Sequence, residues 1–173
     1  MKKNLIIILS LLILLLTGCA GNNTAVEAST EVPTEPIAMQ SCEFDRMRIS
    51  LPECFTEIFR EDIAVVYSNE SDYDNTVMML VLDNMSLEEF DLNKLLEDLG
   101  AESYELEWNK RTTVNGYPAE VFRYHASFEG EVSYTVNYWI QFEDKVYPIT
   151  FSAMDAEFWN ETYDACVESI AFS

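Results

Sequence analysis

Four consecutive segments in the C-terminal half of the chain alternate apolar and polar residues over long stretches, and this pattern restricts the fold more than any other feature. The segments are 104–114, 118–128, 132–142 and 146–153. Turn signals separate them at Asn115-Gly116, Glu129-Gly130 and Glu143-Asp144. Period-two alternation is typical of half-buried strands, and Asn-Gly between two such runs is a strong hairpin signal. The sequence therefore predicts a four-stranded antiparallel meander.

Shorter elements are expected around this meander, in a globular domain that spans residues 41–173. Three further strands are expected at 44–51, 63–68 and 76–82. Ser86 has the spacing of a capping box with Glu89, and leucines follow at helical intervals until Gly100, where a C-terminal cap belongs. Asp155 is placed as the N-cap of a second helix that runs to about Ser169. The chain is long enough for one domain and too short for two.

The apolar positions of the long segments predict one buried sheet face. They are Tyr104, Leu106, Trp108, Phe122, Tyr124, Ala126, Phe128, Val132, Tyr134, Val136, Tyr138, Ile140 and Phe142. Directly opposed residues of an antiparallel pair lie on the same face, so these positions meet only if the first two turns contain an odd number of residues. We therefore expect three-residue loops at 115–117 and 129–131.

The same register gathers polar side chains on the opposite face and gives a candidate binding face. Its members are Glu107, Arg111, Arg123, His125 and Trp139. The register places Glu107 opposite His125, so the single histidine has a carboxylate neighbour. Arginine offers bidentate hydrogen bonds and tryptophan offers rigid contact area. The alternative is a solvated sheet face on which another element covers Trp139.

An enzymatic role is not expected. His125 beside a glutamate has the chemistry of a general base, with Ser127 or Ser133 as nucleophile. However, Ser127 lies only two residues from His125 on the same strand, and the sequence has no Gly-x-Ser-x-Gly elbow. We therefore expect neither a catalytic site nor a cofactor.

A metal site is not expected either. One histidine and four scattered cysteines give no zinc-ligand spacing. Asp72, Asp74 and Asn75 lie close together with Asp83 eleven positions after Asp72, but Val77 occupies the sixth place, where a calcium loop needs glycine. An acidic solvated turn explains this segment better.

The first nineteen residues have the layout of an export signal that ends in a lipidated cysteine. Lys2 and Lys3 precede an apolar run of 5–16, which is too short for a membrane-spanning helix. The segment 16–19, Leu-Thr-Gly-Cys, resembles the bacterial lipobox, in which the cysteine receives diacylglycerol before cleavage of the preceding bond. We therefore expect a lipoprotein signal peptide at 1–18 and lipidation of Cys19. An ordinary signal peptide that happens to hold a cysteine is the alternative.

A polar tether follows the cysteine, and the mature chain is strongly acidic. Residues 19–40 contain few large apolar side chains and two prolines, so they cannot bury enough surface to fold. Removal of the signal peptide takes two of the ten basic residues, so eight remain against 31 acidic ones and the formal charge becomes −23. Such a chain is repelled by nucleic acid, which we exclude as a partner.

Three cysteines remain once Cys19 is assigned to the lipid, so they cannot all pair. Cys42 and Cys54 are the expected disulfide because they flank one strand and the turn after it, and export allows oxidation. Cys166 is expected to be a buried thiol. A reducing envelope would leave all three cysteines free.

Several local motifs, taken in order, resemble the PsbP-like (Mog/PsbP) family. They are 47–52 Met-Arg-Ile-Ser-Leu-Pro, 114–119 Val-Asn-Gly-Tyr-Pro-Ala, 147–151 Tyr-Pro-Ile-Thr-Phe and 169–172 Ser-Ile-Ala-Phe. The resemblance implies an α+β fold, an antiparallel β-sheet flanked by helices as an α/β/α sandwich, and work in binding or assembly. A cystatin-like or NTF2-like curved sheet is the alternative fold.

These observations together predict a lipid-anchored lipoprotein on the extracytoplasmic face of the cell membrane. We expect a non-catalytic binding or assembly module of the cell envelope, with an envelope protein as its partner. The alternative is a small-ligand or substrate-binding lipoprotein that serves a transporter.

Overall fold

Two antiparallel sheets contain most of the residues that the computed structural model describes, which are 37–69, 72–98 and 100–173, without the side chains of 72–74. The expected signal peptide, Cys19 and nearly all of the tether lie outside this range, as do the side chains of Asp72 and Asp74. The strands are β1 (Met39–Phe44), β2 (Met47–Pro52), β3 (Phe55–Glu61), β4 (Ala64–Asn69), β5 (Asp72–Leu80), β6 (Leu82–Asp83), β7 (Ser103–Val114), β8 (Tyr117–Phe128), β9 (Glu131–Phe142), β10 (Lys145–Ala153) and β11 (Ala171–Phe172).

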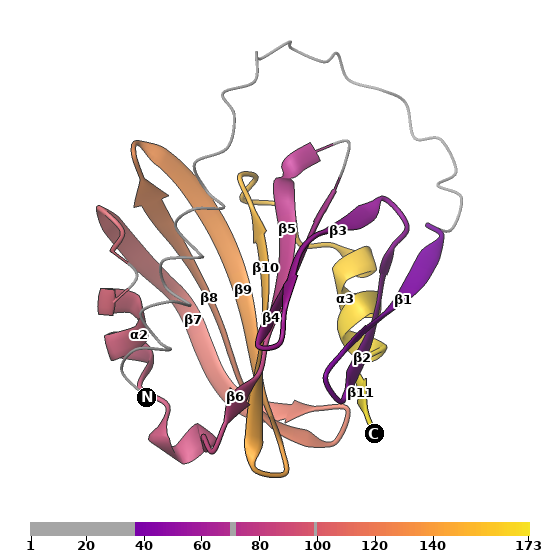
Figure 1. Cartoon of the computed structure of the whole chain (residues 1–173). Helices are drawn as coiled ribbons and strands as arrows, with labels where there is room; N and C mark the ends of the chain where they lie inside the picture. Colours follow the sequence, from indigo (N-terminus) through magenta and orange to yellow (C-terminus); the bar gives the residue numbers. More distant parts are fainter. Residues whose placement is uncertain (1–36, 70–71, 99) are drawn as a thin grey trace.

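The large sheet has the strand order β3-β4-β5-β10-β9-β8-β7, with β6 paired to β10. The small sheet has the order β1-β2-β11. Figure 1 shows the small sheet and the helix α3 (Glu161–Glu168) on one side of the large sheet, and the helix α2 (Leu92–Asp98) on the other. The expected meander of four long strands is confirmed as β7 to β10.

The α/β/α sandwich expected from the family resemblance is wrong, because the fold is rich in β-structure and its helices are short. The first expected helix divides into the 3₁₀ helix η1 (Leu87–Glu89) and the seven-residue α2, with Phe90 extended between them. The second begins at Asn160, whose side chain accepts a hydrogen bond from the Thr162 N–H. Asp155, the expected cap, instead closes a turn by accepting from the Glu157 N–H. Among the described residues, no helix is long and apolar enough to cross a membrane.

The small sheet fills much of the layer that a long helix was expected to occupy. The expected strand at 44–51 is interrupted by a turn at Asp45, where φ is +51°, and only its part from Met47 onward belongs to one strand, β2. Residues 39–44 pair with 47–52 across this turn, and β11 then adds to the other edge of β2. The strands β1 and β3 were not predicted from the sequence.

The two expected three-residue loops are also wrong. Val114 pairs directly with Tyr117 and Phe128 with Glu131, so each turn contains two residues. Both residues of the first turn, Asn115 and Gly116, have positive φ, at +51° and +88°. This is the geometry of the two-residue hairpin turn whose twist matches that of the strands.

The shorter turns reverse the relation between the strand faces. Phe122 lies opposite Asn137 and Tyr124 opposite Thr135, so the apolar positions of β8 and those of β9 point to opposite sides of the sheet. Each side is therefore apolar and each is covered. We call the side packed against the small sheet and α3 the α3 face, and the side packed against η1 and α2 the α2 face.

The larger core lies on the α3 face. It joins both sheets and α3 through side chains that are almost fully buried, among them Met47, Ile49, Tyr147, Phe151 and Cys166. A smaller core on the α2 face joins Leu87 and Leu96 to Phe122 and Trp139. Both layers are needed because a sheet that is apolar on both sides has to be covered on both.

Candidate functional site

The five residues of the expected binding face are divided between the two faces of the sheet. Glu107, Arg123 and His125 lie together on the α3 face. Arg111 pairs with Glu120, which pairs in turn with Trp139, so these residues lie on the α2 face. The two-residue turns cause this division, because they change which positions share a face.

A charged cluster forms where Glu107 lies between Arg123 and His125. Arg123 Nε is 2.8 Å from Glu107 Oε2, in an ion pair whose N–H is not aligned for a hydrogen bond. His125 Nδ1 is 3.4 Å from Glu107 Oε1, and its Nε2 is 3.7 Å from Glu105 Oε2. The histidine therefore has two carboxylate neighbours.

A β-bulge brings both glutamates to the histidine. His125 pairs directly with Glu105, not with Glu107 as expected, and Arg123 pairs with Trp108. The register shifts between Leu106 and Trp108, so Glu107 is the extra residue and its side chain stays on the α3 face. Because Tyr104, Leu106 and Trp108 continue a regular alternation, no pattern in the sequence indicates the bulge.

The cluster lies where the layer over the α3 face ends. Arg123 Nη2 donates to the carbonyl of Ala156, and its guanidinium lies 6.0 Å from the ring of Phe158, both in the segment before α3. His125 lies against Tyr134, with ring centroids 5.5 Å apart. Beyond them, Trp108 and Val132 are 40% and 37% exposed. We call Glu105, Glu107, Trp108, His125, Val132 and Tyr134 the open patch.

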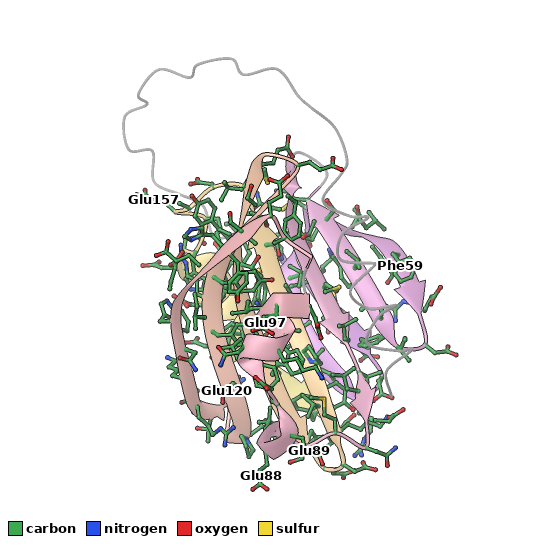
Figure 2. All side chains as sticks on the ribbon, turned by 90° about the vertical axis from the view of Figure 1, so that its left-hand side faces the viewer. Phe59, Glu88, Glu89, Glu97, Glu120 and Glu157 are labelled. Carbon is green, nitrogen blue, oxygen red and sulfur yellow. The ribbon has the colours of Figure 1, made fainter. Side chains whose placement is uncertain are left out.

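Arg111 and Trp139 hold the layer on the α2 face. Trp139 is 6% exposed, and its ring centroid lies 4.3 Å from that of Phe90. Arg111 donates from Nε to Glu120 Oε2 at 3.0 Å and from Nη2 to the Leu87 carbonyl at 3.1 Å. Figure 2 looks onto this side, with Glu97 of α2 in front of the sheet and Glu88 and Glu89 of η1 at its lower end. The alternative given by the sequence, that another element covers Trp139, therefore describes its environment.

The serines near His125 do not form a nucleophile site. The Ser127 hydroxyl donates to Glu102 Oε2 at 3.4 Å. Ser133 is buried opposite Ala126, on the α2 face and away from the histidine. A serine nucleophile needs a base within hydrogen-bond reach, so this geometry does not support acyl transfer.

The described residues contain no group of three or more His, Cys, Asp or Glu side chains that could hold a metal ion. The cysteines with described positions, Cys42, Cys54 and Cys166, are free thiols. Cys42 is buried and pairs with Ile49, whereas Cys54 is exposed beyond Pro52. Ile49 and Pro52 are three residue steps apart along β2, about 10 Å, which exceeds the reach of a disulfide. The expected Cys42–Cys54 bond is not formed in this structure.

A second candidate site, which the sequence reading missed, is a polar cleft of about 340 Å³ at one end of the α3 layer. Its lining comes from the β2–β3 turn, the facing ends of β4 and β5, and the segment leading into α3. The lining residues are Ile37, Pro52, Cys54, Phe55, Asn69, Asn75, Asp155, Glu157, Phe158, Asn160, Thr162 and Tyr163. They come from strand ends, turns and the start of α3, and they are spread along the sequence from residue 37 to residue 163, so no local motif marks them.

The comparisons with known proteins show the fold. No protein-family model matches the sequence, and a search of curated proteins finds no match. Among solved structures, cyanobacterial PsbP (CyanoP) from Synechocystis sp. PCC 6803 aligns with a TM-score of 0.63 and 11% identity over 84% of this chain and 98% of that one. LpqN, involved in cell envelope biogenesis of Mycobacterium tuberculosis, aligns with a TM-score of 0.51 and 11% identity over 82% and 87%.

A protein of Bacteroides thetaiotaomicron VPI-5482 also aligns, with a TM-score of 0.53 and 8% identity over 74% of this chain and 45% of that one. At such identities the likeness concerns the fold alone. The PsbP-like fold expected from the sequence is confirmed, in the β-rich form described above.

Proposed function

We propose that this protein is a lipid-anchored module on the extracytoplasmic face of the cell membrane, where it binds or helps to assemble an envelope protein without acting as an enzyme. The proposed location is based on the sequence of the first nineteen residues, which predicts export and lipidation of Cys19. Two acyl chains on one cysteine are enough for stable membrane anchoring.

The observation that carries the binding role is the open patch. It combines a half-exposed tryptophan, a tyrosine and a valine with a histidine between two glutamates, at the place where the α3 layer ends. Aromatic residues are enriched in protein interfaces because they offer large, rigid contact area, and charged groups around them supply specificity. Arg123 is fixed by Ala156 and Glu107, so the patch is preorganised.

The structural neighbours support the same role by analogy. LpqN is described as involved in cell envelope biogenesis, and its fold aligns over most of both chains. A fold hosts many functions, so this likeness supports the proposal only together with the open patch.

Photo-crosslinking from the open patch tests the binding role. A photoreactive amino acid replaces Tyr134 in the full-length protein, which is expressed in its native membrane and irradiated there. The matched control carries the same group at Ile58, an exposed apolar residue (48%) on the opposite edge of the large sheet. We expect a crosslinked protein from position 134 only. The same crosslinks from both positions, or none from 134, would contradict the proposal.

Trp139→Ala, a natural first choice from the sequence, is unsuitable as a binding variant. Because Trp139 is buried against Phe90, its loss would unfold part of the α2 layer and remove binding for an unrelated reason. Val132→Asp is the better choice, since Val132 is exposed on the patch itself. We expect it to abolish the crosslink from position 134 while leaving the melting temperature within a few degrees of wild type.

The lipid anchor has its own test. Cys19→Ala should remove metabolic labelling by a fatty acid and release the protein from the membrane fraction. A variant that is still labelled and still membrane-bound would show that Cys19 is not the lipidated residue.

Small-ligand binding in service of a transporter remains a second candidate, favoured by the polar cleft. Its volume of about 340 Å³ is at the lower end of the range for small-molecule sites. Native mass spectrometry of the protein purified from its own membrane would detect a bound molecule. Thr162→Trp, which places an indole in the cleft, should then remove that molecule, whereas Val132→Asp should not.

A further inference from the structure

The strand β7 forms one edge of the large sheet and is unusually open for its length. Within the described part of the chain it pairs only with β8, so the backbone groups on its outer side have no strand partner. Ten of its twelve side chains are exposed; Leu106 and Val114 are the other two. Two large exposed residues, Tyr104 (43%) and Trp108 (40%), lie on this one strand. A long exposed edge strand is a template for pairing with another chain.

The charges of β7 are opposite in its two halves. Glu105 and Glu107 lie in the first half, and Lys110 and Arg111 in the second. Their sum is zero, in a chain whose formal net charge is −21. A second copy that approaches this strand in antiparallel orientation therefore meets charges opposite to its own, whereas most of the remaining surface is acidic and self-repelling.

The bulge at Glu107 selects one register for such a pairing. Before the bulge, odd-numbered side chains point to the α3 face, as Glu105 does toward His125. After the bulge, even-numbered side chains do so, as Trp108 does opposite Arg123 and Lys110 does opposite Val121. Opposed residues of an antiparallel pair must share a face, and only a register centred on the bulge keeps this true along the whole strand.

We propose that two copies of this protein associate through β7, antiparallel, so that Glu105 of each copy lies opposite Lys110 of the other. The same register places Tyr104 opposite Arg111 on the α2 face and Glu107 opposite Trp108 on the α3 face. It joins two eight-stranded sheets into one continuous sheet. The interface includes Glu105, Glu107 and Trp108 of the open patch, so it shares these residues with the proposed binding role, but it does not depend on the lipid anchor.

Two contacts in this register are chemically favourable: Glu105 with Lys110, and Tyr104 with Arg111, whose side chain is 62% exposed although it also binds Glu120 and the Leu87 carbonyl. Glu105 is 75% exposed and Lys110 is exposed, so both are free to form an ion pair across the new strand boundary. Arginine stacks on tyrosine through its planar guanidinium. The strand at the other edge of the sheet, β3, does not have opposite charges available in its two halves, because Glu57 already forms a hydrogen-bonded pair with Arg60 on the same strand. An edge-to-edge contact of this size is small, so we expect a dissociation constant on the order of micromolar.

Charge reversal and mixing test the proposed register. Glu105→Lys and Lys110→Glu each create two like-charge contacts across the interface, so each variant alone should dimerise at least roughly tenfold more weakly than wild type. In a mixed dimer, the two lysines of the Glu105→Lys copy lie opposite the two glutamates of the Lys110→Glu copy. Each of the two contacts is then again an ion pair. An equimolar mixture should therefore recover wild-type association. Glu61→Lys on β3 is the control and should change nothing.

Sedimentation equilibrium of the full-length protein in detergent gives the readout. A dimer that is weakened in each single variant and restored in the mixture would support the proposal. A wild-type monomer at roughly 100 µM, well above the expected dissociation constant, would overturn it. So would a dimer that neither variant weakens, which would place the interface elsewhere, or a mixture that stays monomeric although both variants melt like wild type.

Hydrogen exchange provides a measurement that needs no variant. The outer amides of β7 should exchange more slowly as the wild-type concentration rises. Protection that is independent of concentration, or that rises on another strand instead, would also overturn the proposal.

Discussion

The two faces of the large sheet are both apolar, but they are covered in different ways. The α3 face is covered by a second sheet and a helix that share one continuous core with it, and polar bonds join the layers around its rim. Over β7 to β10, the α2 face is covered by η1 and the seven-residue α2, whose contact with the sheet is centred on Trp139 and Phe90.

This difference explains which of the expected site residues are available for binding. On the α2 face, Arg111 and Trp139 are used to attach the covering layer. On the α3 face, the layer ends at Arg123 and leaves the open patch uncovered. A tryptophan therefore has a structural role on the α2 face, as Trp139, and is exposed on the α3 face, as Trp108.

The largest effect is expected on the α2 face, from Trp139→Ala. Truncation of a buried tryptophan that anchors a thin layer should lower the free energy of unfolding by about 3–4 kcal/mol. Trp108→Ala, at a half-exposed position on the α3 face, should change it by less than about 0.5 kcal/mol. Urea denaturation of both variants measures this, and equal losses would mean that the assignment of the two tryptophans is wrong.

The rim of the α3 face should be next in sensitivity, at Asn115. Its Nδ2 lies 2.9–3.1 Å from the carbonyl oxygens of Val167, Glu168 and Ile170, so it joins the β7–β8 turn to the end of α3. Asn115→Gly removes these bonds and should cost about 1 kcal/mol. Asn115→Ala removes the same bonds and, because alanine adopts positive φ less readily than asparagine or glycine, should cost about 1 kcal/mol more than the glycine variant.

Urea denaturation separates the two contributions at Asn115. Asn109→Ala, on the exposed part of β7, is the matched control and should be nearly neutral. If the alanine and glycine variants at 115 were equally stable, backbone strain at this turn would be unimportant.

A smaller and pH-dependent effect is expected where the small sheet meets β10. Burial of Asp45 opposes its ionisation, but the hydroxyl of Tyr147 and the ammonium of Lys145 donate to its carboxylate, and the net result is a lowered pKa. A carboxyl whose folded pKa lies below its unfolded value stabilises the protein above the unfolded value, near 4, and loses this contribution as pH falls through the folded pKa.

Asp45→Asn should therefore cost about 1–2 kcal/mol at pH 7, and this cost should shrink below about pH 4. Denaturation curves at pH 7, 5 and 3 check both statements. Asp144→Asn, at an exposed neighbour in the β9–β10 turn, is the control and should leave the free energy of unfolding at pH 7 nearly unchanged. A cost that is constant with pH would mean that the ionised carboxylate is not what holds the small sheet to β10.

Thiol labelling tests the α3 core without any substitution, and so without any effect on stability. Burial raises the pKa of Cys166 to about 12 and also raises that of Cys42, whereas Cys54 is exposed. Because the thiolate is the reactive form, Cys54 should react with iodoacetamide in the native protein, and the other two only after unfolding. Peptide mass spectrometry with and without reductant checks this. A Cys54 that reacts only after reduction would restore the disulfide hypothesis.

The long strands were predictable because their signal is local. Period-two alternation and the Asn-Gly and Glu-Gly turns placed β7 to β10 within a few residues of their bounds. The helices were less predictable, since helical spacing at 87–99 and 155–169 also fits a short helix preceded by turns. Where such a helix begins depends on which residue caps it, and in the second helix the N-cap is Asn160 instead of Asp155.

The candidate site was predictable in part. Glu107, Arg123 and His125 do lie together, although the register that led to this expectation was wrong and a bulge corrects it. Cys19 and the lipid anchor remain predictions from the first nineteen residues. The polar cleft and the exposure of Trp108 had no signal in the sequence, because they depend on where covering elements end.

The sequence by itself determined the meander, the acidic charge and the alternation of apolar positions, because each of these follows from residues that are neighbours along the chain. Only the tertiary structure decided which face each apolar set covers. A single residue more or fewer in a turn exchanges the two faces, and the left-handed backbone of Asn115 and Gly116 favours the two-residue turn. That choice places Trp139 beneath the α2 layer, where it is buried, and Trp108 on the α3 face, where it is 40% exposed.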